Sequence, residues 1–254
     1  MIPKIIHYCW LSGDPFPEDI KKCIQSWKEI LPDYEFWLWD TNRFDIESTP
    51  WTKQAFETKK YAFAADYIRL YALYNYGGIY LDSDVLMYKS FNDLLNLPYF
   101  IGTDQDGAFE PAIIGAEKKT YWLKNVLKRY ENLNFITSNH TYNTTPLPMV
   151  FFNELTGIYK FKKIQKKEDF LYRPDYISVF DSDFFNARNS IEVHPTKRSY
   201  CSHNYAGSWK GKEKGLKKII KDLLPKSILK IYFDLSHSTW NKKRILIHKI
   251  QFEK

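Results

Sequence analysis

The spacing of apolar residues in the first part of the chain predicts alternating strands and helices. Residues 2–10 (IPKIIHYCW) and 34–39 (YEFWLW) are short runs rich in β-branched and aromatic residues, as in buried strands. Between them, residues 18–31 carry apolar side chains at helical spacing. The same spacing predicts helices over 51–59 and 62–76, and a glycine pair ends the second of these helices.

A third strand follows the glycine pair in the stretch GGIYLDSDV and runs directly into two aspartates. Strands that alternate with helices are typical of an α/β domain with a mostly parallel sheet flanked by helices. In such sheets ligands bind beyond the carboxyl ends of the strands. We therefore expect Trp10, Asp40 and the pair Asp82 and Asp84 to lie at one edge of the sheet.

The rest of the chain shows a less regular pattern. Residues 98–104 (PYFIGTD) and 111–117 (PAIIGAE) are predicted as short strands around a loop, and residues 119–131 as a helix. Residues 142–205 are predicted as loops and short strands without defined boundaries.

The composition is that of a globular protein with a sizeable core, since 44% of the 254 residues are hydrophobic and 26% are charged. Cys9, Cys23 and Cys201 are scattered, which argues against a disulfide framework and fits reduced thiols. The first residues read as a strand rather than as a signal peptide. No window approaches the roughly 18 uninterrupted apolar residues of a membrane span. These features predict a cytoplasmic protein that does not cross a membrane.

The positive charge is concentrated at the C-terminus. Of 37 Lys/Arg and 30 Asp/Glu residues, 13 and 4 lie in residues 210–254, which leaves 24 and 26 in the first 209. A nearly neutral body argues against a nucleic-acid-binding protein. The chain therefore divides into a body, residues 1–209, and a basic extension, residues 210–254.

The two aspartates of the third strand are candidate metal ligands. Side chains alternate along a strand, so Asp82 and Asp84 are predicted to point to the same side. Paired carboxylates repel each other unless a cation lies near them, and Mg²⁺ or Mn²⁺ would suit them. The alternative is a strand that ends in an ordinary solvated turn. The preceding helix supports the metal site, because Asp66 and Arg69 are three residues apart and share a helical face.

Three blocks of the sequence together resemble one enzyme family. The run AFAADYIRLYALYNYGGIYLDSDV, the opening IPKIIHYCWLSG and the late segment YCSHNYAGSW occur in this order. They are similar to blocks of the DXD-containing glycosyltransferases of family 32, which include bacterial capsular and lipopolysaccharide sugar transferases and fungal mannosyltransferases. They also resemble the glucosyltransferase domain of large clostridial toxins. The resemblance implies a GT-A-like nucleotide-sugar-binding fold for residues 1–209.

The resemblance also implies roles for individual residues. Asp82 would contact the donor's ribose or sugar, and Asp84 would bind the metal, Mn²⁺ or Mg²⁺, that bridges the diphosphate. Asp66 and Arg69 would hold sugar hydroxyls and orient the leaving group, and His203 would complete the metal ligands. The remaining expected donor contacts come from both ends of the body: His7, Trp10, Ser208, Trp209 and Lys210.

The function that follows is a metal-dependent, retaining transfer of a hexose from a nucleotide sugar to a saccharide acceptor or a lipid-linked oligosaccharide. A UDP-sugar donor and a role in capsule, exopolysaccharide or lipopolysaccharide synthesis are favoured. Asp104, Asp106 and Glu110 are read as solvated loop acids, so no dedicated nucleophile is expected. The alternatives are a Mg²⁺-dependent phosphohydrolase and a non-enzymatic, basic and aromatic nucleic-acid-binding protein.

The basic extension combines apolar residues with lysines. Leu216, Ile219, Ile220, Leu223 and Leu224 fall on one stripe, with lysines beside or opposite it. Such an amphipathic segment either lies on an anionic membrane surface or packs on the catalytic body. The sequence leaves both options open, so the cytoplasmic face of an inner membrane is an alternative location.

Overall fold

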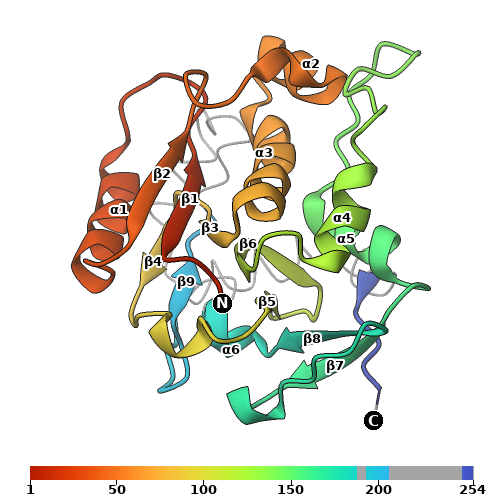
Figure 1. The fold of residues 1–254 in the computed structure, drawn as a ribbon. Helices are drawn as coiled ribbons and strands as arrows, with labels where there is room; N and C mark the ends of the chain where they lie inside the picture. Colours follow the sequence, from red (N-terminus) through yellow and green to blue (C-terminus); the bar gives the residue numbers. More distant parts are fainter. Residues whose placement is uncertain (188–192, 206–247, 254) are drawn as a thin grey trace, which may run out of the picture.

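A seven-stranded sheet forms the centre of the protein in a computed structural model that describes residues 1–187, 193–205 and 248–253 (Figure 1). Strand β6 is antiparallel to both of its neighbours, and every other pairing in this sheet is parallel. The predicted α/β architecture, a mostly parallel sheet flanked by helices, is confirmed. In spatial order the strands are β2 (Glu35–Trp39), β1 (Ile5–Cys9), β3 (Gly78–Leu81), β6 (Phe109–Ala116), β5 (Tyr99–Thr103), β8 (Tyr176–Phe180) and β7 (Lys160–Ile164).

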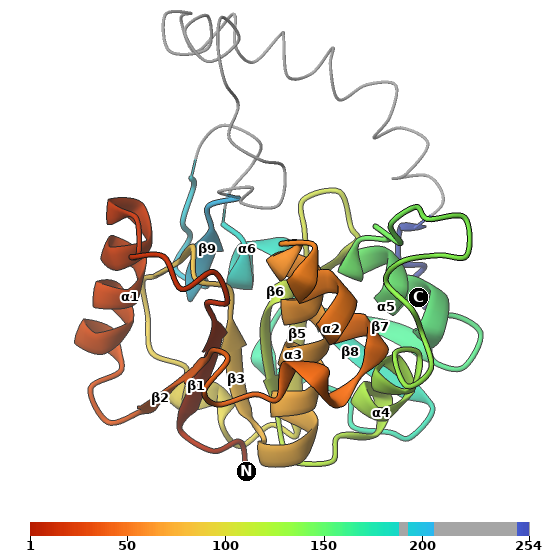
Figure 2. The ribbon, with the colours of Figure 1, turned by 90° about the horizontal axis from the view of Figure 1, so that it is seen from above.

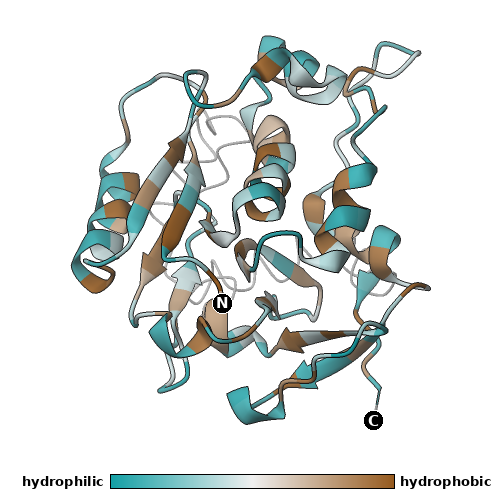
Figure 3. Ribbon diagram, viewed as in Figure 1, coloured by the Kyte–Doolittle hydropathy of each residue, from teal (hydrophilic) through white to brown (hydrophobic). Residues whose placement is uncertain are grey.

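Helices cover both faces of the sheet and enclose a hydrophobic core on each (Figures 1 and 2). One core lies under α2, α3, α4 and α5, and the other lies under α1 and α6. Helices such as α1 show both brown and teal segments in Figure 3, because only one side of each faces a core. The helices are α1 (Glu18–Ile30), α2 (Pro50–Glu57), α3 (Tyr61–Tyr76), α4 (Tyr121–Lys128), α5 (Leu147–Leu155) and α6 (Ser182–Phe185).

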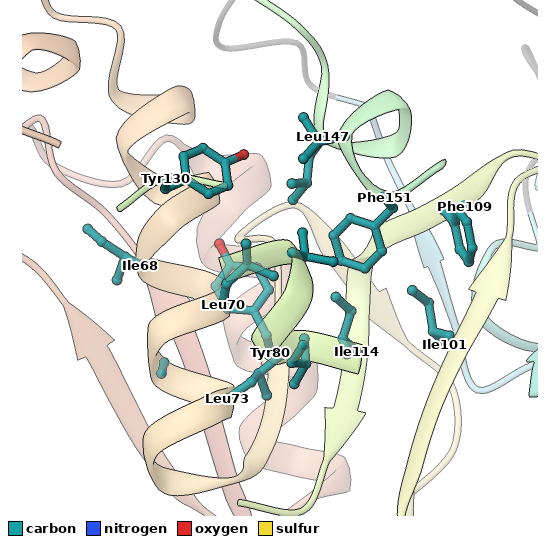
Figure 4. Close-up of a cluster of buried hydrophobic side chains, with 14 of the residues drawn as sticks. Ile68, Leu70, Leu73, Tyr80, Ile101, Phe109, Ile114, Tyr130, Leu147 and Phe151 are labelled. Atoms are coloured by element: carbon teal, nitrogen blue, oxygen red, sulfur yellow. The ribbon is translucent and has the colours of Figure 1, made fainter. Parts of the chain in front are cut away.

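Strand β3 shows how the alternation of side chains serves both cores. Ile79 and Leu81 point into the core under α1, whereas Tyr80 points into the core under α3. Figure 4 shows Tyr80 beside Leu70 and Leu73 of α3. Because β3 is buried on both faces, its position and the direction of its end are fixed by packing.

A second, two-stranded antiparallel sheet joins distant parts of the chain. It pairs β4 (Val85–Met87), which follows β3 after a short turn, with β9 (Cys201–His203). Three short 3₁₀ helices, η1 (Ile46–Ser48), η2 (Asn92–Leu94) and η3 (Lys167–Asp169), lie in the connections. The pairing of β4 with β9 places residues more than a hundred positions apart side by side.

The predicted helices and strands of the first part of the chain are confirmed. Two predictions need correction, one at the end of β3 and one in residues 142–205. Strand β3 ends at Leu81, so the aspartates lie in a turn and not on the strand. The region 142–205 contains the regular elements α5, β7 and β8, which the sequence pattern did not define.

The glycine pair turns the chain from α3 into β3. Gly77 ends the helix with φ +69° and donates its N–H to the Leu73 carbonyl, and Gly78 has φ +108°. The His7 ring holds this turn, because its Nε2 lies 2.7 Å from the Gly77 carbonyl oxygen. A Cβ atom on Gly78 would lie 2.8 Å from the Ile5 carbonyl oxygen and 2.9 Å from His7 Nε2. Only glycine meets both demands at this position.

The last described residues pack on the body. The Ile250 N–H bonds to the Gly107 carbonyl, and Phe252 forms a parallel bridge with Phe161 of β7. The predicted amphipathic stripe, which includes Leu216, Ile219, Ile220 and Leu223, lies outside the described residues. Within the described parts of the chain, no helix is both long and apolar enough to span a membrane. The three cysteines are buried and form no disulfide, as predicted.

We expect Gly78→Ala to destabilise the fold by roughly 2 kcal/mol or more, because the new Cβ adds overpacking to the cost of a positive φ. Urea denaturation would measure the change in the free energy of unfolding. Gly13→Ala is the matched control, since Gly13 also has positive φ but no atom within 4 Å of the added Cβ. Equal losses in the two variants would contradict this account of the turn.

Candidate active site

The two aspartates of the DXD motif lie in the turn between β3 and β4. The Asp82 N–H extends the sheet pairing by bonding to the Ala112 carbonyl at 2.9 Å, and the Val85 N–H closes the turn on the Asp82 carbonyl at 3.0 Å. The alternation of a strand therefore does not align the two side chains. They are brought together instead by the turn and by the strand that pairs with β4.

Strand β9 places His203 next to the two aspartates. His203 pairs with Val85 in the small sheet, and the Asn204 N–H bonds to the Asp84 carbonyl at 3.1 Å. As a result, His203 Nε2 lies 3.3 Å from Asp84 Oδ1 and 3.9 Å from Asp82 Oδ2. The structure thus brings the three predicted metal ligands together.

The three side chains fit a divalent cation. One ligand atom from each of Asp82, Asp84 and His203 can be chosen so that all three atoms lie within 4.8 Å of one another. Two carboxylates and one imidazole suit Mn²⁺ well and Mg²⁺ through the carboxylates. All three side chains are partly or largely buried, so a cation held here would be poorly hydrated and its charge would act strongly on a bound diphosphate.

Arg69 is buried and contacts two carboxylates at this cluster. Its Nη2 lies 2.9 Å from Asp82 Oδ1 and 3.5 Å from Asp66 Oδ1, and its Nη1 donates to the Pro111 carbonyl at 2.6 Å. The guanidinium also lies 4.4 Å from the centre of the Tyr80 ring, and the Tyr80 hydroxyl donates to the same Asp82 oxygen. The predicted pair of Asp66 and Arg69 is present. With only 5% of its surface exposed, Arg69 orients carboxylates within the protein.

Burial changes the acidity of the groups around Arg69. It raises the pKa of Asp66 to about 7, although Arg69 opposes the shift, and it also raises the pKa of Asp82. Loss of water disfavours a carboxylate, and the neighbouring acids add repulsion. Asp66 is therefore suited to form hydrogen bonds with sugar hydroxyls as either acceptor or donor near neutral pH.

Glu110 is not a solvated loop acid, contrary to the sequence prediction. It lies on β6 and is 4% exposed, and its Oε1 is 3.3 Å from His203 Nδ1. Its Oε2 accepts hydrogen bonds from Asn186 at 2.8 Å and from the Tyr205 hydroxyl at 2.7 Å. Burial by itself raises the pKa of Glu110, but the facing His203 and the hydrogen bonds from Tyr205 and from the Ala112 N–H lower it overall.

The other two acids of this region lie in the turn between β5 and β6. Asp104 is half-buried and accepts hydrogen bonds from two backbone N–H groups of its own turn, those of Asp106 and Ala108. Burial raises the pKa of Asp104 to about 7, with a further contribution from Glu110. Asp106 is exposed, as predicted for a solvated loop acid.

The predicted donor contacts have different outcomes. Trp10 follows β1 directly and lies at the same sheet edge as Asp82, because β1 and β3 run parallel. Its ring is half-buried against Phe16, so stacking on a base stays a prediction. His7 is fully buried, with Nδ1 accepting a hydrogen bond from the Trp39 indole, so its place is in the sheet and direct donor contact is not available to it.

Burial lowers the pKa of His7 to about 4, which keeps its ring neutral in this structural role. Ser208, Trp209 and Lys210, the last predicted donor contacts, lie outside the described residues. Their roles stay predictions.

Four residues of the site were not assigned to it from the sequence. Tyr80 was detectable, because it stands two residues before Asp82 in the quoted strand. Tyr205 lies in the quoted segment YCSHNYAGSW, two residues after His203, whereas Glu110 and Asn186 carry no local motif. The three residues meet only through the fold.

A comparison with known protein families supports the DXD motif predicted from the sequence. Residues 17–101 match the family described as "Glycosyltransferase sugar-binding region containing DXD motif". The predicted resemblance is therefore confirmed for this region, which contains Asp66, Arg69, Asp82 and Asp84.

The curated relatives include two yeast proteins. "Mannosyl phosphorylinositol ceramide synthase SUR1" of Saccharomyces cerevisiae is 30% identical over 203 residues, covering 76% of this chain and 52% of the relative. "Inositol phosphoceramide mannosyltransferase 3" of Schizosaccharomyces pombe is 30% identical over 154 residues, covering 58% of this chain and 43% of the relative. The chain thus spans about half the length of these relatives.

Among solved structures, the chain is similar to a glycosyltransferase involved in glycosylation of the major capsid of PBCV-1. That likeness has a TM-score of 0.46 at 14% identity and covers 80% of this chain and 95% of the other. The PaToxG glycosyltransferase gives a TM-score of 0.44 at 22% identity, with coverage of 61% and 69%.

We expect Arg69→Ala to lower the free energy of unfolding by about 3–5 kcal/mol, because it removes a buried guanidinium and leaves the largely buried Asp66 and the partly buried Asp82 without their cation. Urea denaturation in the presence of a chelator would measure the loss. Arg129→Ala is the matched control: its ion pair with Glu154 is more than a quarter exposed on both sides, so about 1 kcal/mol or less should be lost. If Arg69→Ala lowered the free energy of unfolding no more than Arg129→Ala, the contacts of Arg69 would not be required for stability.

Proposed function

We propose that the protein is a metal-dependent glycosyltransferase that moves a hexose from a nucleotide sugar to a saccharide or lipid-linked acceptor with retention of configuration. One observation carries the proposal. Asp82, Asp84 and His203 converge to form a candidate cation site, and the Asp66–Arg69 pair lies beside it. Four of these five residues fall within the region that matches the glycosyltransferase sugar-binding family.

The chemistry needs a site that tolerates growing negative charge. Breaking a sugar–phosphate bond leaves charge on the departing nucleoside diphosphate. Asp82, Asp84 and His203 would hold a Mn²⁺ or Mg²⁺ ion, which supplies Lewis-acid stabilisation of that charge when bound. Arg69 keeps Asp82 in place through its 2.9 Å contact, and Asp66 would bond the hydroxyls of the donor sugar.

The surroundings of the site favour a front-face transfer. A double displacement needs a carboxylate or other nucleophile aimed at the anomeric carbon. Among the described acids near the site, Glu110 faces His203, and Asp66 and Asp82 face Arg69. We therefore propose that the leaving phosphate helps to deprotonate the acceptor hydroxyl.

The donor and acceptor remain proposals, and the relatives add a second candidate for both. The sequence favoured a UDP-sugar and a capsule or lipopolysaccharide acceptor. The names of the yeast relatives instead specify mannosyl transfer to inositol phosphoceramide. A mannosyl donor with an acceptor that carries a sugar-like polyol on a lipid phosphate is accordingly the second candidate.

The same contacts weigh against a phosphohydrolase. Such an enzyme needs one aspartate free to attack phosphorus. Asp82 Oδ1 already accepts hydrogen bonds from Arg69 and from the Tyr80 hydroxyl, which favours a holding role.

We expect release of nucleoside diphosphate from one of UDP-galactose, UDP-glucose, UDP-N-acetylhexosamine or GDP-mannose in the presence of Mn²⁺, and its loss on chelation. Asp84→Asn should lower turnover by about 100-fold or more, because it removes a charged ligand at the leaving group. A coupled assay for the released diphosphate measures both effects, and NMR of the product gives the anomeric configuration.

Asp19→Asn serves as the control for that assay, since Asp19 is an exposed carboxylate on α1 and should leave turnover unchanged. Full activity in chelator, or an unaffected Asp84→Asn variant, would contradict the metal-dependent mechanism. An inverted product would contradict the front-face transfer.

We also propose peripheral association with an anionic membrane surface through the basic extension. The support is the charge segregation in the sequence, with 13 basic against 4 acidic residues in 210–254. Residues 248–253 pack on the body, so a membrane contact would fall in the part of the extension that precedes them.

The triple variant Lys217→Gln, Lys218→Gln and Lys221→Gln in the full chain should bind vesicles of anionic phospholipid about 100-fold more weakly than the wild type, at roughly 1 kcal/mol per lysine. Vesicle flotation measures the bound fraction. Neutralising three exposed lysines of the body, Lys22, Lys166 and Lys197, is the matched control. Equal binding by the wild type and the extension variant would refute the membrane proposal.

A further inference from the structure

Glu110 is a buried acid whose place in the site is not explained by binding donor or acceptor. Its residue is only 4% exposed, so other groups of the protein surround its side chain. Its Oε1 lies 3.3 Å from His203 Nδ1 and also accepts the Ala112 N–H at 3.2 Å. A buried carboxylate is costly unless hydrogen bonds and a cationic partner compensate for the lost water.

The two carboxylate oxygens of Glu110 contact different partners. Oε2 accepts from Asn186 Nδ2 and from the Tyr205 hydroxyl, so both of these donors hold the oxygen that does not face His203. Asn186 is fully buried, so this anchor is fixed by the body of the protein. The remaining oxygen, Oε1, is thereby directed at the imidazole.

The imidazole is held between two sets of carboxylates. Nδ1 faces Glu110, and Nε2 faces Asp84 at 3.3 Å and Asp82 at 3.9 Å. When Nδ1 carries a proton and donates it to Glu110, Nε2 keeps its lone pair free for a cation. A histidine ligand needs such a partner on its other nitrogen to fix its tautomer and ring orientation.

We infer that Glu110 is a positioning residue for the metal: it binds His203 Nδ1 and so fixes the tautomer and orientation in which Nε2 joins Asp82 and Asp84. The inference rests on the proposed metal-dependent function. It assigns Glu110 no contact with the metal, because Asp82, Asp84 and His203 form the candidate ligand group and Glu110 stands behind the ring. It also gives the antiparallel strand β6 a direct part in the site.

The inference predicts a graded loss of metal affinity. Glu110→Ala should weaken Mn²⁺ binding by about 10- to 100-fold, because the ring loses its partner on Nδ1. Glu110→Gln should fall between this variant and the wild type, since an amide oxygen still accepts the Nδ1 proton but lacks the charge. Mn²⁺ titration followed by electron paramagnetic resonance measures affinity without donor, acceptor or turnover.

Two controls separate positioning from general stability. Tyr205→Phe removes one hydrogen bond to Glu110 but keeps the ring beside His203, so Mn²⁺ affinity should change less than threefold. In a His203→Ala background, Glu110→Gln should cause no further loss of affinity, because the two residues act as one unit. A merely structural effect of Glu110 would instead add to the loss caused by His203→Ala.

The outcomes distinguish this inference from the proposed function. Wild-type affinity in a folded Glu110→Gln and Glu110→Ala, or additive losses with His203→Ala, would overturn the role of Glu110 while leaving the metal site intact. Failure of the wild type itself to bind Mn²⁺ would overturn both the metal-dependent function and the inference. Mn²⁺ binding without any sugar transfer would refute the transferase proposal alone.

Discussion

The site depends on the balance of charge around Arg69 and His203. Glu110 is buried, Asp66 is largely buried and Asp82 is partly buried, and carboxylates removed from water are stable only beside cations or several donors. Arg69 supplies the cation on the α3 side, and His203 stands on the β9 side. A cation between Asp82, Asp84 and His203 would complete this balance, which links the stability of the region to what it binds.

The direction of β6 makes this arrangement compact. Because β6 runs antiparallel to β3, the start of β6 lies next to the end of β3, and Leu81 pairs with Ile113. Pro111, whose carbonyl accepts from Arg69, and Glu110, which faces His203, therefore reach the same edge as the aspartates. The single reversed strand brings two more polar groups to an edge where parallel strands already end.

The sequence predicted the local parts of this site well. Helix α3 has apolar residues at helical spacing and ends at a glycine, so its bounds and the shared face of Asp66 and Arg69 follow from short-range rules. Strand alternation does not align Asp82 and Asp84 as predicted, because the strand stops at Leu81 and a turn carries both residues. Their proximity to His203 was predicted only through the family resemblance, since β9 is three residues long and pairs with a strand more than a hundred residues away. The contacts of Asn186 and Tyr205 with Glu110 could not be predicted, although Tyr205 lies in the same segment as His203, because long-range packing alone forms them.

The last described residues pair with β7, and this pairing affects how readily the protein would associate with itself in concentrated solution. β7 is an edge strand of the main sheet, and an open edge invites pairing with a second chain. The bridge from Phe252 to Phe161 and the ion pair between Glu253 and Lys160 occupy part of that edge. Lys162 and Lys163 add charge along the same strand. Phe252 and Glu253 therefore cover part of this edge and hinder its pairing with a second chain.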